Sequence, residues 1–383
     1  MNPLAPKDFV LFCAGEDSGD IIGSQALVAM EHLKLEARGV GGPLMQQAGL
    51  MQLANFDDLA VNGYIDVLFK YKSLKKTLSL LKKTIKQTQC RAVVLIDFPG
   101  FNMKLLAFAK QNGKPILYLS PPQIWAWKSW RAKHLRGVLL GVFFDWEQKA
   151  YQKQQCQTVK IEHPFLQASK KVLNSSAAEK KRVLFLLGSR SRQIQRNLEL
   201  YTELQKQLHL QNPLLEIQWV LSRSTHKKTL SKEHQKNSII APRNLDERAR
   251  LYAEAYYIVA HPGTAVLEAS LVQSPVLAFS KIEFPSYLIG RFLLRIPCIT
   301  LPNLITKKNL VSEVLSYKNS HLKKEIPYIT ENILKNISKT SKHKNELIAL
   351  QRACEGVTIQ NLTLEFFMNI FDRDTNHSRL SKG

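Results

Sequence analysis

The stretch VVLIDFPGFN, residues 93–102, decides the fold, and ILYLSPPQIWAW, residues 116–127, repeats its pattern. Residues 93–96 form a continuous apolar run, which is typical of a strand buried on both faces of a parallel sheet. The run ends at Asp97, and Pro99 cannot continue the hydrogen bonds of a strand. Apolar residues at helical spacing follow, so the pattern predicts a strand–helix–strand unit in a parallel α/β sheet.

The carboxyl ends of these two predicted strands indicate where a ligand would bind, because α/β sheets bind ligands beyond that edge. Asp97 follows the first strand, and Ser120, Gln123 and Trp125 follow the second. We expect these side chains to lie at one edge of the sheet. Tryptophans alternate with basic residues from Trp125 to Arg131. This pattern suits a stacked nucleobase, the wall of a sugar or acyl pocket, or simple packing.

Composition bounds the class of protein. A chain of 383 residues with 45% hydrophobic residues fits two soluble domains. The net charge of +23 predicts an anionic partner: nucleic acid, phospholipid headgroups or phosphorylated small molecules. Five scattered cysteines without metal-like spacing indicate buried thiols in a reducing compartment. No uncharged apolar run reaches the roughly 18 residues of a membrane span, so we expect a cytoplasmic protein.

The segment GEDSGDIIG, residues 15–23, joins a predicted strand at residues 9–14 to a predicted helix. Gly19 and the glycine four residues later share a helical face and allow close backbone approach. Ser18 or Asp20 can cap the helix. The N–H groups of its first turn suit a phosphate, although the GxGxxG fingerprint is absent. Tight packing without any ligand is the alternative.

Residues 64–86, YIDVLFKYKSLKKTLSLLKKTIK, predict a basic amphipathic helix, with apolar residues at helical spacing and seven lysines. Such a helix can lie on an anionic membrane. Alternatively, it packs its apolar stripe into the core and leaves its lysines in solvent. The side chains that we expect to contact the membrane are Leu68, Phe69 and Leu81.

The α/β alternation begins again after a polar stretch at residues 173–181, where we place a domain boundary. Residues 188–190 and 263–265 each follow a predicted strand and offer backbone N–H groups at a helix N-terminus. Arg190 adds a guanidinium suited to phosphate oxygens. Glu268 lies one turn into the second helix, where a carboxylate can accept from ribose hydroxyls. The pair predicts a nucleotide diphosphate site, with plain helix capping as the alternative.

Several sequence blocks, in this combination and order, resemble the bacterial lipid-A-disaccharide synthase family of GT-B glycosyltransferases. They extend over roughly residues 9–371. The blocks are GEDSGDIIG, GVGGPLMQQAG, LIDFPGFN, SPPQIWAW with Arg131 after it, GSR, PGTAVLE, and LPNLI with Glu313 downstream.

The resemblance implies an α/β GT-B fold, in which two Rossmann-like, doubly wound domains face an interdomain cleft. Residues 1–176 would bind the acceptor and associate with the membrane, and residues 177–345 would bind the UDP-sugar. Residues 346–371 would form a helix that packs back toward the first domain. Residues 372–383 form a polar tail, which we expect to be disordered.

The implied reaction belongs to lipopolysaccharide lipid A biosynthesis. UDP-2,3-diacylglucosamine would transfer its sugar, with inversion, to the 6-hydroxyl of 2,3-diacylglucosamine 1-phosphate. The products would be the β-1,6-linked lipid A disaccharide 1-phosphate and UDP. The implied location is peripheral, on the anionic cytoplasmic face of the inner membrane. A second copy of the chain, in a homodimer, is a further candidate partner, and no nucleic acid, metal or other cofactor is expected.

The resemblance also carries residue roles to matching positions. Asp97 matches the family's proposed general base, and an inverting transfer needs a carboxylate to take the acceptor proton. Arg190 matches a diphosphate-binding position, while Glu268 and Asn303 match positions near the ribose and uracil. The helix at residues 64–86 matches a membrane-associating region, which favours the membrane interpretation. The substrate-binding candidates are Glu16, Ser18, Gly19, Asp20, Asn102, Ser120, Gln123, Trp125, Arg131, Gly188, Ser189, Arg190, Gly263, Thr264, Ala265, Glu268 and Asn303.

Departures from the family pattern leave the acyl-chain preference and the acceptor identity open. They are Gly100, Glu162, Gln193, Pro262 and the FDWE block at residues 144–147. Two other functions compete. A UDP-N-acetylglucosamine 2-epimerase also has a GT-B fold but needs no lipid. A nucleic-acid-binding protein would use the charge of +23, but no DNA- or RNA-binding motif is present.

Overall fold

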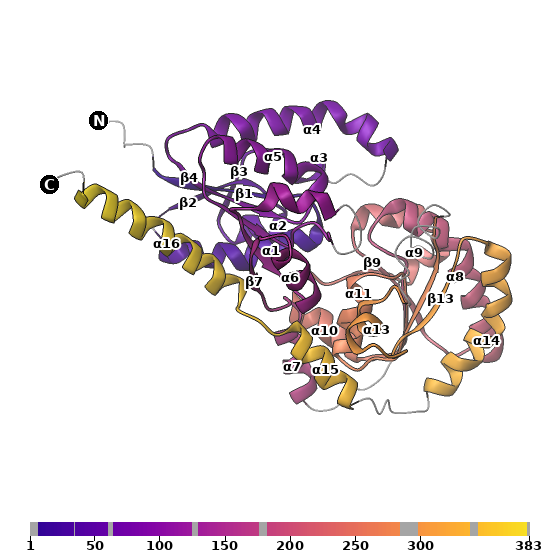
Figure 1. Ribbon diagram of the computed structural model, residues 1–383. Coiled ribbons are helices and arrows are strands. Elements are labelled where there is room, and N and C mark those ends of the chain that lie inside the picture. Colours follow the sequence, from indigo (N-terminus) through magenta and orange to yellow (C-terminus); the bar gives the residue numbers. More distant parts are fainter. Residues whose placement is uncertain are drawn as a thin grey trace. The chain divides into compact units, whose positions relative to one another are not determined.

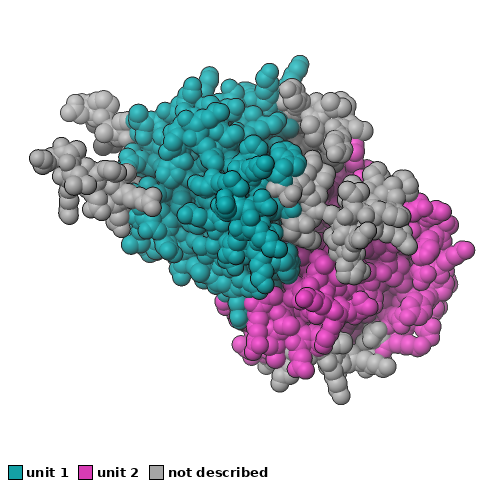
Figure 2. Space-filling view, in the orientation of Figure 1, with its two compact units in different colours: residues 1–164, 354–383 teal, residues 165–353 magenta. Residues whose placement is uncertain are grey.

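The computed structural model forms two compact units, which Figure 2 shows in different colours. The first contains residues 1–164 and 354–383, and the second contains residues 165–353. The residues that the structure describes are 7–33, 35–59, 64–124, 129–175, 182–283, 298–337 and 344–380.

The first unit is built on a seven-stranded parallel sheet with the order β3-β2-β1-β4-β5-β6-β7 (Figure 1). The chain winds outward from β1 in both directions, so the loops that leave β1 and β4 border the point where the winding reverses. The strands are β1 (Phe9–Ala14), β2 (Glu36–Val40), β3 (Leu50–Gln52), β4 (Cys90–Ile96), β5 (Ile116–Leu119), β6 (Leu139–Val142) and β7 (Gln157–Lys160).

Helices cover both faces of this sheet. Alternate residues of β1 point to opposite faces: Leu11 packs with α4 and α5, and Phe12 packs with α1 and α16. The helices of this unit are α1 (Asp17–Val28), η1 (Ala29–His32), α2 (Pro43–Gln47), α3 (Phe56–Leu59), α4 (Tyr64–Ile85), α5 (Pro99–Gln111), η2 (Ser129–Leu135), α6 (Asp145–Gln152) and α16 (Ile359–Leu380).

The second unit repeats this plan with a six-stranded parallel sheet in the order β10-β9-β8-β11-β12-β13. Its winding reverses between β8 and β11. The aromatic side chains of Phe185, Tyr201, Trp219 and Phe279 fill the core on one face. The strands are β8 (Arg182–Leu186), β9 (Ile217–Leu221), β10 (Ser238–Ile240), β11 (Ala255–Ala260), β12 (Val276–Lys281) and β13 (Ser312–Ser316).

The helices of the second unit are α7 (Leu166–Asn174), α8 (Ser191–Gln211), η3 (Ser224–Thr229), α9 (Lys232–Lys236), α10 (Leu245–Ala253), α11 (Thr264–Leu271), α13 (Leu301–Thr306), α14 (Asn319–Ile337) and α15 (Lys344–Cys354). Two doubly wound parallel sheets confirm the predicted α/β class.

The unit boundaries differ from the predicted domain limits. The first unit ends at residue 164 instead of 176, because α7 packs on α10 and α11 of the second unit. In place of one helix at residues 346–371, the chain forms α15 and α16. Val357, between them, pairs with Ile161 beside β7. α16 packs on α1 and continues to Leu380, where disorder was expected from residue 372.

Candidate active site

The loop after β4 carries Asp97 in an unusual backbone conformation. Asp97 and Phe98 have φ angles of 47° and 48°. Ser120, which follows the neighbouring strand β5, has a φ of 52°. Non-glycine residues seldom adopt this left-handed region, which costs about 1–3 kcal/mol each, and such residues cluster at functional sites. The strain therefore lies at the sheet edge where the sequence predicts a site.

Asn102 holds this loop in place from the first turn of α5. Its Nδ2 lies 2.8 Å from the Asp97 carbonyl oxygen, 3.1 Å from that of Ile96 and 3.3 Å from that of Cys13. The Tyr118 hydroxyl also donates to the Asp97 carbonyl, at 2.9 Å. Asn102 is fully buried. The Asn102 amide nitrogen is committed to the backbone of the site loop, and the contact of Asn102 with substrate stays a prediction.

The Asp97 side chain is partly exposed, and a residue of α1 contacts it. The Ser18 hydroxyl lies 3.3 Å from Asp97 Oδ2 and donates to it. Glu16, just before α1, and Ser18 are both partly buried. The structure therefore brings Ser18 and Asp97 together, although they lie 79 residues apart in the sequence.

Gly19 and Asp20 both have structural roles, which corrects the prediction that Asp20 binds substrate, whereas the prediction for Gly19 stays untested. Gly19 is buried, and a Cβ atom there would lie 3.2 Å from the Cβ of Ala14. The Asp20 carboxylate accepts hydrogen bonds from the N–H groups of Leu44 and Met45, at 3.1 and 3.0 Å. It therefore caps α2, and with only 2% of its surface exposed it is withdrawn from ligands.

The candidates beyond β5 have mixed outcomes. Gln123 is exposed, Arg131 is partly buried, and Trp125 lies outside the described residues. Burial, and then the negative charge of Asp97, raises the pKa of Tyr118 well above its ordinary value, while the charge of Arg131 opposes the rise. Tyr118 is therefore a neutral donor to the site loop, and Arg131 contributes positive charge near it.

The predicted membrane contact of Leu81 is wrong. Leu81 is fully buried and packs in the core of the first unit with Ile85 and Leu105, so it could reach a lipid only if the core opened. Leu68 and Phe69 belong to α4, but their side chains lie outside the described part of the structure.

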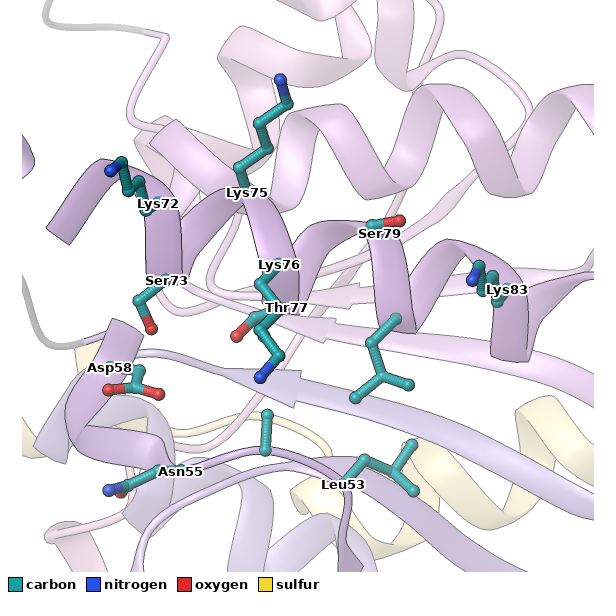
Figure 3. Close-up of a pocket in the computed structure, with 12 residues that line it drawn as sticks. Leu53, Asn55, Asp58, Lys72, Ser73, Lys75, Lys76, Thr77, Ser79 and Lys83 are labelled. Atoms are coloured by element: carbon teal, nitrogen blue, oxygen red, sulfur yellow. The ribbon is translucent and has the colours of Figure 1, made fainter.

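A basic pocket of about 680 Å³ lies between α4 and residues 53–58. Its lining includes apolar Leu53 and four exposed lysines, and Figure 3 shows Lys76 pointing from α4 toward the facing segment. None of the four makes an ion pair with another described residue. The lysines are Lys72, Lys75, Lys76 and Lys83.

In the second unit, the loop after β8 leads into the long helix α8. Gly188 has a φ of 111°, and a Cβ atom there would lie 2.7 Å from Gln193 Oε1, so glycine is required. Arg190 is the N-cap of α8, and both Ser189 and Arg190 are exposed. The loop therefore presents a guanidinium beside the positive end of a 21-residue helix.

The loop after β11 lies directly beside it. β8 and β11 are paired, and the His261 N–H donates to the Leu186 carbonyl at 2.7 Å. Gly263 is the N-cap of α11. Gly263 and Thr264 are exposed and Ala265 is partly buried. The two predicted anion-binding segments thus meet at one sheet edge, and the N–H groups that open α11 have no partners within the helix.

His261 lies beside both of these segments, and no sequence motif singled it out. A Cβ atom at Gly188 would lie 3.3 Å from His261 Cδ2, so the imidazole stands against the first loop. Burial, aided by the charges of Arg196 and Arg190, lowers the pKa of His261 to about 4. Its position directly after β11 was the available signal.

The two residues predicted near the ribose and uracil are both buried. Glu268 accepts a hydrogen bond from Arg248 at 3.3 Å. Burial raises the pKa of Glu268 above its ordinary value, and the Arg248 charge opposes the rise. Its contact with ribose stays a prediction.

Asn303 is corrected to a structural residue. Its Oδ1 accepts from the Val311 N–H at 2.8 Å. Its Nδ2 donates to the Val311 carbonyl at 2.7 Å and to Glu313 Oε1 at 2.9 Å. Because these bonds join α13 to the chain at and just before β13, the amide has little capacity left for a base.

Within the described ranges, no group of three or more His, Cys, Asp or Glu side chains is arranged to hold a metal ion. No helix in the same ranges has the length and apolar character needed to cross a membrane.

One known protein family matches most of this chain. A family model described as lipid-A-disaccharide synthetase matches residues 10–363. The lipid-A-disaccharide synthase of Coxiella burnetii (strain Dugway 5J108-111) is 30% identical to the chain over 318 residues, which cover 80% of this chain and 84% of the relative.

Two solved structures share the fold. The S. aureus MnaA–UDP co-structure matches with a TM-score of 0.60 at 12% identity and covers 97% of both chains. The Acinetobacter baumannii MurG structure matches with a TM-score of 0.50 at 11% identity and covers 94% of this chain and 98% of its own. At these identities the likeness shows the fold alone, and it confirms the predicted GT-B class.

Proposed function

The chain belongs to the lipid-A-disaccharide synthetase family, and from that premise we propose that it joins UDP-2,3-diacylglucosamine to 2,3-diacylglucosamine 1-phosphate. It is a hexosyltransferase of lipid A biosynthesis. The reaction inverts the anomeric centre and yields the β-1,6-linked disaccharide 1-phosphate and UDP. The family match over residues 10–363 is the single observation that carries the proposal.

Asp97 is the general base of the proposed reaction. It is partly exposed beyond β4, in a strained loop that Asn102 and Tyr118 hold by its backbone. A base must be fixed within hydrogen-bond reach of the acceptor hydroxyl while positive charge develops on the donor sugar. The Ser18 hydroxyl donates to Asp97 Oδ2 and so helps to orient the carboxylate that takes the proton.

The donor diphosphate belongs to the edge formed by β8 and β11. Arg190 supplies a charged fork, and the N-termini of α8 and α11 supply N–H groups and positive dipole ends. These groups stabilise the charge that UDP gains as it leaves. We assign no metal ion to this step, and we expect a chelator to leave UDP release unchanged.

The lysine-lined pocket beside α4 supports peripheral binding to the anionic cytoplasmic face of the inner membrane. Lys72, Lys75, Lys76 and Lys83 are exposed and make no ion pair with the residues described. Each lysine near such a surface contributes about 1 kcal/mol. This location suits an enzyme whose two substrates carry acyl chains.

Release of UDP tests the proposed reaction directly. The chain should release UDP when the acylated donor and acceptor are both present, and it should release none when either is omitted. Mass spectrometry should find the disaccharide 1-phosphate. UDP release from the donor alone would contradict transfer. Epimerisation of UDP-N-acetylglucosamine in the absence of lipid would instead support a 2-epimerase.

A further inference from the structure

Two buried side chains, Asn197 and Ser280, favour one tautomer of His261. The first is Asn197, on α8. Its Nδ2 donates to the Gln193 carbonyl at 2.9 Å, and its Oδ1 accepts from the Lys281 N–H at 2.8 Å. A carbonyl can only accept and an N–H can only donate, so the orientation of the Asn197 amide is fixed.

Ser280, on β12, connects Asn197 to His261 through its hydroxyl group. Its Oγ lies 3.1 Å from Asn197 Oδ1 and 3.2 Å from the Lys281 carbonyl. Both of these atoms only accept, so a Ser280 proton that pointed to His261 would leave Ser280 Oγ facing two acceptors with no proton between them. The arrangement that satisfies all of these contacts has Ser280 donate to one of the two oxygens and His261 Nδ1, 2.7 Å from Ser280 Oγ, donate to Ser280. The neutral imidazole carries its proton on Nδ1 and has a lone pair on Nε2.

The surroundings of His261 are positive in the free chain. Arg190 and Arg196 reach it from α8, and together with burial they lower the pKa of His261 to about 4. Lys281 ends the neighbouring strand β12, and Glu283 beyond it is paired with Arg196. Nε2 has no hydrogen-bond partner within the described ranges. At neutral pH it is therefore an acceptor among groups that otherwise favour anions.

The oxygen atoms of a diphosphate bound at this edge also carry lone pairs, so they would repel the lone pair on His261 Nε2. The two negative charges of the diphosphate would also offset the two guanidinium groups and favour a charged imidazole. We propose that His261 takes up a proton from solvent when the donor binds, and that its Nε2–H then donates to a diphosphate oxygen. This inference rests on the proposed function, because it takes a UDP-sugar as the ligand.

The sign of the pH dependence follows from linkage. Because donor binding raises the pKa of His261 from about 4, affinity increases as pH falls. The gain approaches about tenfold per pH unit below the pKa of the bound state and ends near the pKa of the free state. A UDP-sugar suits the measurement, because its esterified diphosphate has no group that titrates in this window.

Calorimetry of the full chain with UDP-N-acetylglucosamine at pH 6.5, in two buffers of different ionisation enthalpy, measures the protons taken up. Wild type should take up a measurable fraction of a proton, and at most one, per ligand bound. His261→Gln should bind with no uptake, because a glutamine amide donates without titrating. His321→Gln, an exposed control on α14, should behave as wild type. UDP serves as a second probe, with its own titration removed by comparing wild type with His261→Gln.

Binding without proton uptake, or the same uptake in His261→Gln, would overturn the role of His261 and leave the proposed function intact. If neither UDP-N-acetylglucosamine nor UDP binds to wild type, the proposed donor site fails, and the inference about His261 fails with it.

Discussion

The two sheets wind in the same order from their first strands, but their carboxyl edges carry opposite kinds of polar group. In the first unit, a single carboxylate, Asp97, stands in a strained loop whose carbonyls are bound by buried Asn102 and Tyr118. In the second unit, Gly188 has a positive φ angle that favours glycine, and Arg190 and two helix N-termini present hydrogen-bond donors. The doubly wound frame therefore determines where a site lies, whereas the loop residues determine its chemistry.

Replacing the carboxylate should have the largest effect. Asp97→Asn keeps the shape of the side chain but removes the base, so we expect turnover to fall by about 10²–10⁴-fold. The affinity for the UDP-sugar should not change, because the proposed donor site belongs to the other unit. Asp8→Asn, an exposed control just before β1 in the first unit, should retain full turnover. Normal turnover in Asp97→Asn would remove the contrast between the two edges.

Arg190→Ala should mainly weaken the binding of UDP, whereas Asp97→Asn mainly slows turnover. A charge-assisted hydrogen bond contributes about 1.5–3 kcal/mol, so UDP should bind about 10–100-fold more weakly. Calorimetry with UDP measures this loss. Arg243→Ala removes an exposed arginine elsewhere in the same unit and should leave the affinity unchanged. If Arg190→Ala binds UDP as wild type does, another group holds the diphosphate.

The support of the Asp97 loop can be tested separately from its chemistry. Asn102→Asp removes the amide donor and leaves buried carbonyls unpaired, so the free energy of unfolding should fall by about 1–3 kcal/mol. Turnover should decrease with little change in donor affinity. Asn112→Asp removes a similar bond, from Nδ2 to the Phe108 carbonyl, at the far end of α5 and should leave turnover intact. A weaker affinity for the donor in Asn102→Asp would instead indicate a contact with substrate.

The lysine pocket should have the smallest effect on catalysis. Replacing Lys72, Lys75, Lys76 and Lys83 together by glutamine should reduce cosedimentation with phosphatidylglycerol vesicles and leave the binding of soluble UDP unchanged. The matched control replaces four exposed lysines of the second unit: Lys227, Lys228, Lys232 and Lys236. An equal loss in both variants would show that total charge, and not this pocket, governs membrane binding.

The sequence was sufficient to predict features that depend on local patterns. A buried apolar strand that ends in a carboxylate predicted the sheet edge and Asp97. Glycine-containing loops before helices predicted the paired segments at Gly188 and Gly263, which the structure brings side by side. These signals lie within a few residues of one another, so a single chain reveals them.

The roles that could not be predicted depend on partners far away in the sequence. Asp20 looked like a ligand, but it caps α2 through Leu44 and Met45. Asn303 bonds to the chain eight residues later, at Val311. His261 was overlooked because its meaning comes from Ser280 and from Asn197, whose contact with each other spans 83 residues. A motif shows that a polar residue is present but not what occupies its hydrogen bonds.

A single-turnover experiment tests the division of labour between Asp97 and Arg190 most directly. Wild type, Asp97→Asn and Arg190→Ala, each in excess over the acylated donor and concentrated enough to bind all of it, are mixed with donor and saturating acceptor, and UDP release is followed. At saturation, Asp97→Asn should remain about 10²–10⁴-fold slow, whereas Arg190→Ala should recover more of the wild-type rate, because the N-termini of α8 and α11 still stabilise the departing UDP. Equal rates for Asp97→Asn and wild type would contradict the account.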